Sequence, residues 1–206
     1  MQTAVLKISV KNMEKRAVCR KYYKDIRNAM SGEEVRDKSK RICENLLADN
    51  AYQTADLIMA YYPLGNEVDC LSVIERTLKE GKKIALPKTS ECGLMDFYEI
   101  TGLQDLEVGS FHIMEPNSAC IRIEPEIYRQ KKILVLVPGI VFDREGNRYG
   151  YGRGYYDRYF ERYPDMKRMA LAYRKQISEE TLECLSTDVK MHVIITEEEK
   201  IKVKNR

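Results

Sequence analysis

Short apolar segments alternate with amphipathic segments along most of the chain. The apolar segments predict strands at Asp56–Pro63, Lys82–Pro87, Met95–Ile100, Lys131–Gly139, Met169–Tyr173 and His192–Thr196. Apolar strands separated by helices are typical of a parallel sheet that is covered on both faces. The pattern therefore predicts an α/β fold: a single three-layer domain over residues 1–206, with a mostly parallel, Rossmann-like sheet and helices on both faces.

Apolar residues that recur every three or four positions predict the helices. The first helix is predicted over Asn12–Ala29, with Val18, Tyr22 and Ile26 on one buried stripe. The other predicted helices are one that begins at the capping box of Ser31 and Glu34, then Asp69–Lys79, Tyr155–Tyr163 and Glu179–Leu185. The polar tail after Ile195 is predicted to be a partly frayed terminus.

Composition narrows the possible classes of function. The chain is 44% hydrophobic and 33% charged with a net charge of +3, which argues against disorder and against a protein that coats nucleic acid. Its apolar runs, such as Ile133–Val137, are far shorter than the roughly 20 residues of a membrane span, and no signal-peptide pattern opens the sequence. Six separated cysteines without a C-x-x-C pair predict reduced thiols and no zinc site. A cytoplasmic protein is expected.

Positive charge is concentrated in two segments. Residues 1–30 contain eight basic and two acidic side chains, and a second arginine-rich segment runs from Arg144 to Arg162. Arg16 and Arg20 are four residues apart and share one helix face, so both can reach one point. Two basic clusters in a nearly neutral chain predict a local anion site. For the first cluster alone, a solvated helix face is an equal alternative.

The most informative segment, Val137–Phe160, is rich in glycine and follows the strongest predicted strand. Its glycines after the strand are Gly146, Gly150, Gly152 and Gly154. Such a loop can adopt positive φ angles and present backbone N–H groups to a phosphate at the start of a helix. Arg148 and Arg153 add forked donors suited to phosphate oxygens, and Asp157 could hold a magnesium ion on them. The spacing matches neither G-x-G-x-x-G nor G-x-x-x-x-G-K-[ST].

These residues resemble the signature of the 5-formyltetrahydrofolate cyclo-ligase family, P-G-x-x-F-D-x-x-G-x-R-x-G-x-G-x-G-Y-Y-D. Every position of that signature is present between Pro138 and Asp157. Further counterparts extend the resemblance over nearly the whole chain: Glu67 after a strand, the segment Gly81–Lys88, the strand Met95–Ile100, the pair Glu115 and Pro116, and Asp188.

The first helix departs from the family pattern. The family usually shows Lys-x-x-x-Arg there. When Arg20 is aligned with the arginine, Arg16 occupies the lysine position and Lys15 lies one residue early. In addition, His192 stands at a later position that is often acidic. The resemblance therefore leaves open which cation before Arg20 contacts phosphate.

The resemblance implies an ATP- and magnesium-dependent ring closure of 5-formyltetrahydrofolate to 5,10-methenyltetrahydrofolate, with release of ADP and phosphate. In such a reaction the γ-phosphoryl group activates the formyl oxygen, and N10 of the same folate attacks the carbon. Phosphoryl transfer relies on positioning and charge stabilisation, so no histidine base is required. The expected partners are these small molecules, without nucleic acid or membrane, and a monomer or weak homodimer is expected.

The resemblance also implies the site residues. The catalytic residues would be Arg148, Arg153 and Tyr155. ATP would contact Lys15, Arg16, Arg20, Arg148, Tyr149, Gly150, Tyr151, Gly152, Arg153, Gly154, Tyr155 and Tyr156. The folate would contact Tyr62, Glu67, Tyr151, Gly152, Arg153, Gly154 and Tyr155. Magnesium would be held by Asp157 and Asp188.

Two alternatives compete with this interpretation. A non-catalytic nucleic-acid-binding protein could use the basic helix for phosphates and the tyrosine-rich loop for stacking, and its binding would depend steeply on salt. Another α/β enzyme of phosphorylated ligands, such as a sugar-phosphate isomerase, would need an acid/base pair near the glycine loop and no ATP. An assay for ATP-dependent conversion of 5-formyltetrahydrofolate distinguishes the three interpretations.

Overall fold

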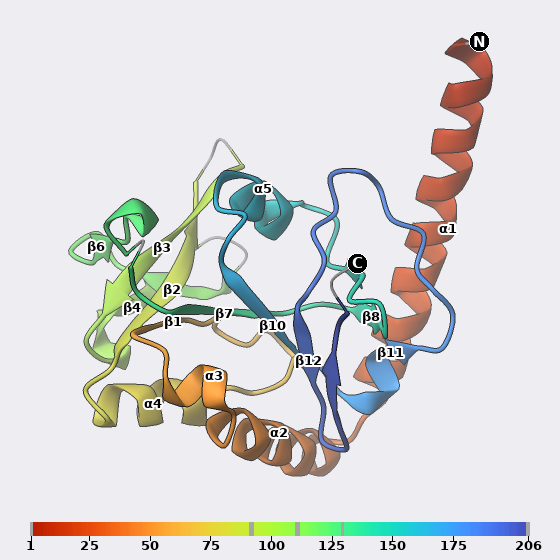
Figure 1. Cartoon of the computed structure of the whole chain (residues 1–206). Coiled ribbons are helices and arrows are strands. Elements are labelled where there is room, and N and C mark those ends of the chain that lie inside the picture. The colour runs from red at the N-terminus through yellow and green to blue at the C-terminus, as the bar shows by residue number, and fades with distance from the viewer. Residues whose placement is uncertain (1, 91–92, 110–111, 129, 205–206) are drawn as a thin grey trace.

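A computed structural model describes residues 2–90, 93–109, 112–128 and 130–204, with residues 2–12 and 127–128 described by their backbone only. An eight-stranded sheet forms its middle layer (Figure 1). From one edge to the other its strands are β13 (Lys200–Lys202), β12 (Val193–Ile195), β10 (Lys167–Leu171), β7 (Ile133–Val137), β1 (Leu57–Met59), β2 (Lys83–Thr89), β3 (Met95–Ile100) and β6 (Ile121–Arg122). The five strands from β12 to β2 are parallel, which confirms the predicted mostly parallel sheet.

Helices cover both faces of this sheet. One face carries α2 (Gly32–Leu47), α3 (Asn50–Gln53) and α4 (Leu71–Lys79), and the other carries α5 (Tyr155–Arg162). Alternate side chains of each strand point to opposite faces. Accordingly, Ile58 of β1 packs in the core beneath α2 and α4, whereas Leu57 and Met59 pack in a second core with Tyr159 of α5. The predicted three-layer α/β architecture is confirmed.

The remaining elements surround these layers. Two small sheets consist of β11 (Ile177–Ser178), β8 (Val141–Asp143) and β9 (Arg148–Tyr149), and of β4 (Leu106–Val108) and β5 (Met114–Pro116). The 3-10 helices are η1 (Leu103–Asp105), η3 (Pro125–Tyr128) and η4 (Arg174–Gln176). The long helix α1 (Gln2–Asn28) runs beside β8 and β11, and its N-terminal half extends away from the rest of the fold (Figure 1).

Local sequence signals account for the start of α2. The Ser31 hydroxyl accepts a hydrogen bond from the Glu34 backbone N–H at 3.1 Å, as predicted for the cap. The Glu34 side chain contacts Lys38 and Lys175 instead of closing a capping box. Ile42 and Leu46 then lie fully buried against the sheet.

The predicted buried stripe of α1 is wrong. Val18 and Tyr22 are 70% and 61% exposed, whereas Arg16 and Arg27 on another face are 6% and 3% exposed. The reason is that α1 packs on loops that present carboxylates and carbonyls, which need donors rather than methyl groups. In the described part of the chain, no helix has the length and apolar character needed to cross a bilayer.

Two further expectations differ from the structure. Residues 179–185 form no helix, because the Leu182 N–H is taken by the Asp143 carboxylate at 2.8 Å and the Glu183 carbonyl by the Tyr149 hydroxyl at 2.7 Å. The tail forms the edge strand β13, with Ile201 buried on the sheet.

The strands β3 and β6 pair antiparallel, outside the parallel array. Among the described residues the cysteines are free thiols: Cys19, Cys43, Cys70, Cys120 and Cys184. Cys92 lies outside the described residues.

Candidate active site

A cavity of about 880 Å³ lies at the carboxyl end of the parallel strands. It is lined by Tyr61 and Pro138 just beyond the ends of β1 and β7, by Pro87 and Thr89 at the end of β2, and by α1, the glycine-rich loop and the start of α5. Open α/β sheets bind ligands at this edge, where the strands leave backbone and loop side chains facing one crevice. A cavity of this size accommodates organic ligands of the size of cofactors.

The glycine-rich loop enters α5 through left-handed backbone. Gly152 and Gly154 have φ angles of +89° and +68°, which disfavour a side chain. Gly154 is the N-cap of α5, and no side chain caps this helix. The N–H groups of the first helical turn, Tyr155 to Asp157, therefore lack helical acceptors and lie at the cavity wall. This geometry suits a phosphate group.

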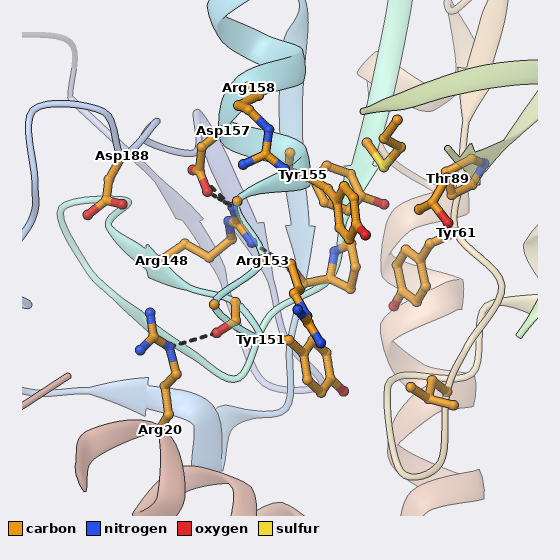
Figure 2. Close-up of a pocket in the computed structure, with 18 of the residues that line it drawn as sticks. Arg20, Tyr61, Thr89, Arg148, Tyr151, Arg153, Tyr155, Asp157, Arg158 and Asp188 are labelled. Atoms are coloured by element: carbon orange, nitrogen blue, oxygen red, sulfur yellow. Dashed lines mark hydrogen bonds and ion pairs between the residues drawn. The ribbon is translucent and has the colours of Figure 1, made fainter. Parts of the chain in front are cut away.

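Two arginines of α1, Arg16 and Arg20, line the cavity beside this loop, and Figure 2 shows the contact of Arg20 with it. Arg16 donates to both carboxylate oxygens of Asp188, at 2.6 and 3.1 Å, and Arg20 donates to the Gly150 carbonyl at 2.9 Å. Both guanidinium groups lie over the ring of Tyr149, which is buried beneath them. Burial acts against the charged forms, but the hydrogen bonds of the ion pair leave the pKa of Arg16 raised and the pKa of Asp188 lowered. Burial, and then the neighbouring Arg16, lower the pKa of Arg20.

Lys15 lies outside the cavity. Its ammonium group is 2.9 Å from the Glu183 carboxylate on the surface, and its side chain is 57% exposed. Arg16, by contrast, lines the cavity. The structure therefore brings Arg16 and Arg20, four residues apart, to the glycine loop, whereas Lys15 is rotated away from it.

Arg148 and Asp157 form a second ion pair at the cavity wall (Figure 2). One guanidinium nitrogen of Arg148 is 3.1 Å from each oxygen of Asp157. Two polar atoms beside this pair, Arg148 Nε and the Tyr156 hydroxyl, are buried without a hydrogen-bond partner among the described residues. Burial raises the pKa of Tyr156 well above its usual range, so its hydroxyl is a neutral donor. Because buried polar groups are normally satisfied, these two atoms indicate a place where a ligand completes the hydrogen bonding.

The donor set suits magnesium only in combination with phosphate. Asp157 and Asp188 both line the cavity, each held by an arginine. Among the described residues, no three His, Cys, Asp or Glu side chains are grouped for a metal ion. Magnesium commonly uses one or two carboxylates, with phosphate oxygens and water as its other ligands. The two carboxylates fit that mode if the arginines turn to the phosphate oxygens.

Glu67 lies at another part of the cavity wall, in the loop after β1. It is 5% exposed and accepts hydrogen bonds from the Leu64 N–H at 3.0 Å and the Tyr151 hydroxyl at 2.8 Å. Burial raises the pKa of Glu67, and the charge of Arg27, 3.8 Å away, opposes that rise. A buried carboxylate in a wall of tyrosines suits a flat heterocycle that carries N–H donors. Tyr62 also lines the cavity.

Arg153 and Tyr155 line the cavity as well, so it collects all of the predicted site residues except Lys15 and Tyr149. Several wall residues were missed from the sequence. Thr89 donates to Glu115 at 3.0 Å, and Met13, Ala17 and Leu185 add apolar surface. Arg27 lies just behind the wall. Its spacing from Arg16, eleven residues or about three helical turns, was the available signal for it.

Comparisons with known proteins agree with this geometry. Residues 12–197 match the model of the 5-formyltetrahydrofolate cyclo-ligase family. The chain is 30% identical over 158 residues to the 5-formyltetrahydrofolate cyclo-ligase of Mus musculus, covering 72% of this chain and 77% of that protein. It is 27% identical to a probable 5-formyltetrahydrofolate cyclo-ligase of Caenorhabditis elegans, covering 91% and 95%. The solution structure of Aquifex aeolicus 5,10-methenyltetrahydrofolate synthetase superposes with a TM-score of 0.79 at 31% identity, covering 93% and 94%.

Proposed function

The chain belongs to the 5-formyltetrahydrofolate cyclo-ligase family, and on that premise we propose that it converts 5-formyltetrahydrofolate to 5,10-methenyltetrahydrofolate with ATP and magnesium. The observation that carries the proposal is that one cavity joins a glycine loop with arginines to a buried carboxylate among tyrosines. The first part suits the phosphates of ATP, and the second suits the pterin ring. ADP and phosphate are the other products.

The chemistry needs activation of a poor electrophile. The formyl oxygen attacks the γ-phosphorus of ATP, the bond from that phosphorus to the bridging oxygen breaks, and ADP leaves. The formyl carbon then carries a phosphate leaving group, so N10 of the same folate attacks it. Loss of phosphate and of the N10 proton leaves the methenyl bridge. Because both nitrogens belong to one molecule, a wall that holds the ring-closing conformer supplies much of the rate.

The positive groups of the cavity have defined tasks in this scheme. The N–H groups at the start of α5 hold phosphate oxygens, and Arg148 and Arg153 add charge-assisted hydrogen bonds. Arg16 and Arg20 approach from α1 and stabilise negative charge as the phosphoryl group moves. When bound, magnesium neutralises phosphate charge, and Asp157 and Asp188 would hold it. The Tyr156 hydroxyl and Arg148 Nε, which lack partners among the described residues, donate to the bound ligands.

At the folate end of the cavity, Glu67 accepts hydrogen bonds from the N–H donors of the pterin. Tyr62, Tyr151 and Tyr155 provide aromatic and backbone surface beside it. These assignments place the formyl group between Glu67 and the glycine loop, where it meets the γ-phosphate.

The test is an assay of the purified protein with 5-formyltetrahydrofolate and magnesium-ATP. We expect the absorbance of the methenyl product to appear together with ADP, and only when ATP and magnesium are both present. Arg148→Ala should lower turnover about tenfold or more, because it removes charge-assisted hydrogen bonds of roughly 1.5–3 kcal/mol each. The exposed Arg36 of α2 supplies the matched control, Arg36→Ala, which should keep full turnover. Absence of product from the intact protein would overturn the proposal.

A further inference from the structure

Arg27 is a buried cation of α1 that joins three separate loops. It is 3% exposed, and its guanidinium donates to the Gly139 carbonyl at 3.3 Å and to the Tyr151 hydroxyl at 2.6 Å. The same group lies 3.8 Å from the Glu67 carboxylate. Gly139 follows β7, Tyr151 lies in the glycine loop, and Glu67 follows β1. One side chain of α1 therefore connects the loop assigned to ATP with the residue assigned to folate.

The direction of the hydrogen bonds follows from the chemistry of these groups. A guanidinium only donates, so the Tyr151 oxygen accepts from Arg27. The single hydroxyl proton of Tyr151 is then directed to Glu67 Oε1, 2.8 Å away. Both oxygens of Glu67 therefore face donors, Oε1 the Tyr151 hydroxyl and Oε2 the Leu64 N–H, and this arrangement favours the ionised carboxylate, whose two oxygens only accept. Glu67 Oε2 accepts from the Leu64 N–H, and each carboxylate oxygen keeps capacity for a ligand donor.

Tyr151 needs this support. It lies between Gly150 and Gly152, and it is 43% exposed on the cavity wall. Glycine on both sides leaves the backbone of this position free to adopt several conformations. Its contacts with Arg27 and Glu67 hold the hydroxyl in one position.

We propose that Arg27 is a positioning residue for folate: through the Tyr151 hydroxyl it orients the Glu67 carboxylate and keeps it ionised to accept the N–H donors of the pterin. This inference rests on the function proposed above. Arg27 is not among the residues that line the cavity, so it acts through its two partners and not on the substrate.

The electrostatics around Glu67 agree with this role. Burial raises the pKa of Glu67, and Arg27 is the opposing charge. Among the described residues, the groups that interact electrostatically with Glu67 include Arg27 of α1, Tyr61 and Cys70 near β1 and α4, and Tyr151 and Tyr156 of the glycine-rich segment. Of these, only Arg27 carries a charge at neutral pH, so its removal raises the pKa of Glu67 further.

Steady-state kinetics as a function of pH test the inference. For Arg27→Gln we expect the folate KM to rise about tenfold or more, as for loss of a hydrogen bond to a charged group, with the ATP KM unchanged. The acidic limb of kcat/KM for folate should move to higher pH, because the carboxylate then protonates at higher pH. Tyr151→Phe, which keeps the ring and the fold, should shift both quantities in the same direction. The double variant should be no worse than the more affected single variant.

Lys24→Gln is the matched control, because it removes one positive charge from an exposed position of the same helix. It should leave both KM values and the pH profile unchanged. If the intact protein does not convert 5-formyltetrahydrofolate, the proposed function itself is wrong. If the intact protein is active but Tyr151→Phe and Arg27→Gln leave the folate KM and the acidic limb unchanged, the positioning role is overturned. Equal effects on the ATP and folate KM values would also overturn it, and should Arg27→Gln fail to fold, Tyr151→Phe decides alone.

Discussion

Two neighbouring cations of α1, Lys15 and Arg16, occupy different environments. Arg16 is 6% exposed and paired with Asp188 in the cavity, whereas Lys15 is paired with Glu183 on the surface. The 100° rotation between consecutive residues of a helix is enough to separate them. The family pattern has a lysine four residues before its arginine, and in this chain an arginine stands there. An arginine keeps the charge and presents its N–H donors as a planar fork that can bind two phosphate oxygens at once.

This difference leads to a prediction for catalysis. Arg16→Ala should lower kcat at saturating ATP by about tenfold or more, because it removes charge-assisted hydrogen bonds to the moving phosphoryl group. Lys15→Ala, the matched control, should keep kcat within about twofold, because Lys15 lies outside the cavity and only forms a weak ion pair on the surface. Initial rates of methenyl formation measure both. A normal Arg16→Ala enzyme with an impaired Lys15→Ala enzyme would contradict the assignment.

A second prediction for a single residue concerns Asp157 and magnesium. Asp157→Asn keeps the shape of the side chain but removes the charge that magnesium prefers. The magnesium concentration needed for half-maximal rate should rise about tenfold, and excess magnesium should restore part of the rate. A titration of the initial rate with magnesium measures this. An unchanged magnesium requirement would limit Asp157 to structural contacts with Arg148 and the Val189 N–H.

At the scale of elements, the glycine loop needs positive φ angles, a backbone conformation that residues with a side chain rarely adopt. A Cβ at Gly152 would meet only Arg20 Cζ, at 3.9 Å, so the cost of Gly152→Ala is that of the positive φ, about 1–2 kcal/mol. Because we propose that this loop binds the phosphates of ATP, we expect a lower melting temperature together with a higher ATP KM.

Gly81 provides the matched control for that variant. It has a φ of +69° after α4, with open space where an alanine Cβ would lie and no part in the cavity wall. Gly81→Ala should lower the melting temperature by a similar amount and leave the ATP KM unchanged. Thermal unfolding and ATP titrations of both variants distinguish the loss of stability caused by the backbone strain from an effect on ATP binding. Equal ATP KM values in the two variants would show that the loop does not bind the nucleotide.

At the scale of the whole molecule, one histidine links stability to pH. The backbone N–H of Arg168 donates to Nδ1 of His192 between β10 and β12, and burial followed by the charge of Arg168 lowers the pKa of His192 to about 4. The ordinary pKa is 6.5, so the unfolded chain binds this proton first. Stability should therefore be fully present above about pH 6.5 and fall as the pH is lowered towards 4.

Urea unfolding at a series of pH values tests this linkage. His192→Gln should flatten the decline between pH 6.5 and 4, while the exposed His112 provides the control variant His112→Gln, with the slope of the unmodified chain. If the free energy of unfolding of His192→Gln still declines between pH 6.5 and 4, other titratable groups cause the decline.

The sequence by itself determined the features that depend on neighbouring residues. Apolar strands such as Ile133–Val137, the Ser31 cap and the glycine spacing of the phosphate-type loop are local patterns, and the structure has strands, cap and loop at those positions. The same patterns sufficed for the α/β class and for the family, because a parallel sheet imposes continuous apolar runs and the loop a dense set of glycines.

Only the tertiary structure decided which face of α1 is buried. Hydrophobic periodicity favours Val18 and Tyr22, but the surface against which α1 packs is made of carboxylates and carbonyls from residues more than a hundred positions away, such as Asp188 and Gly139. The buried side chains are therefore arginines. The connection from Arg27 through Tyr151 to Glu67 joins three distant segments of the chain, so no local pattern contains it. Complementarity between loops that meet only in the folded protein sets these contacts.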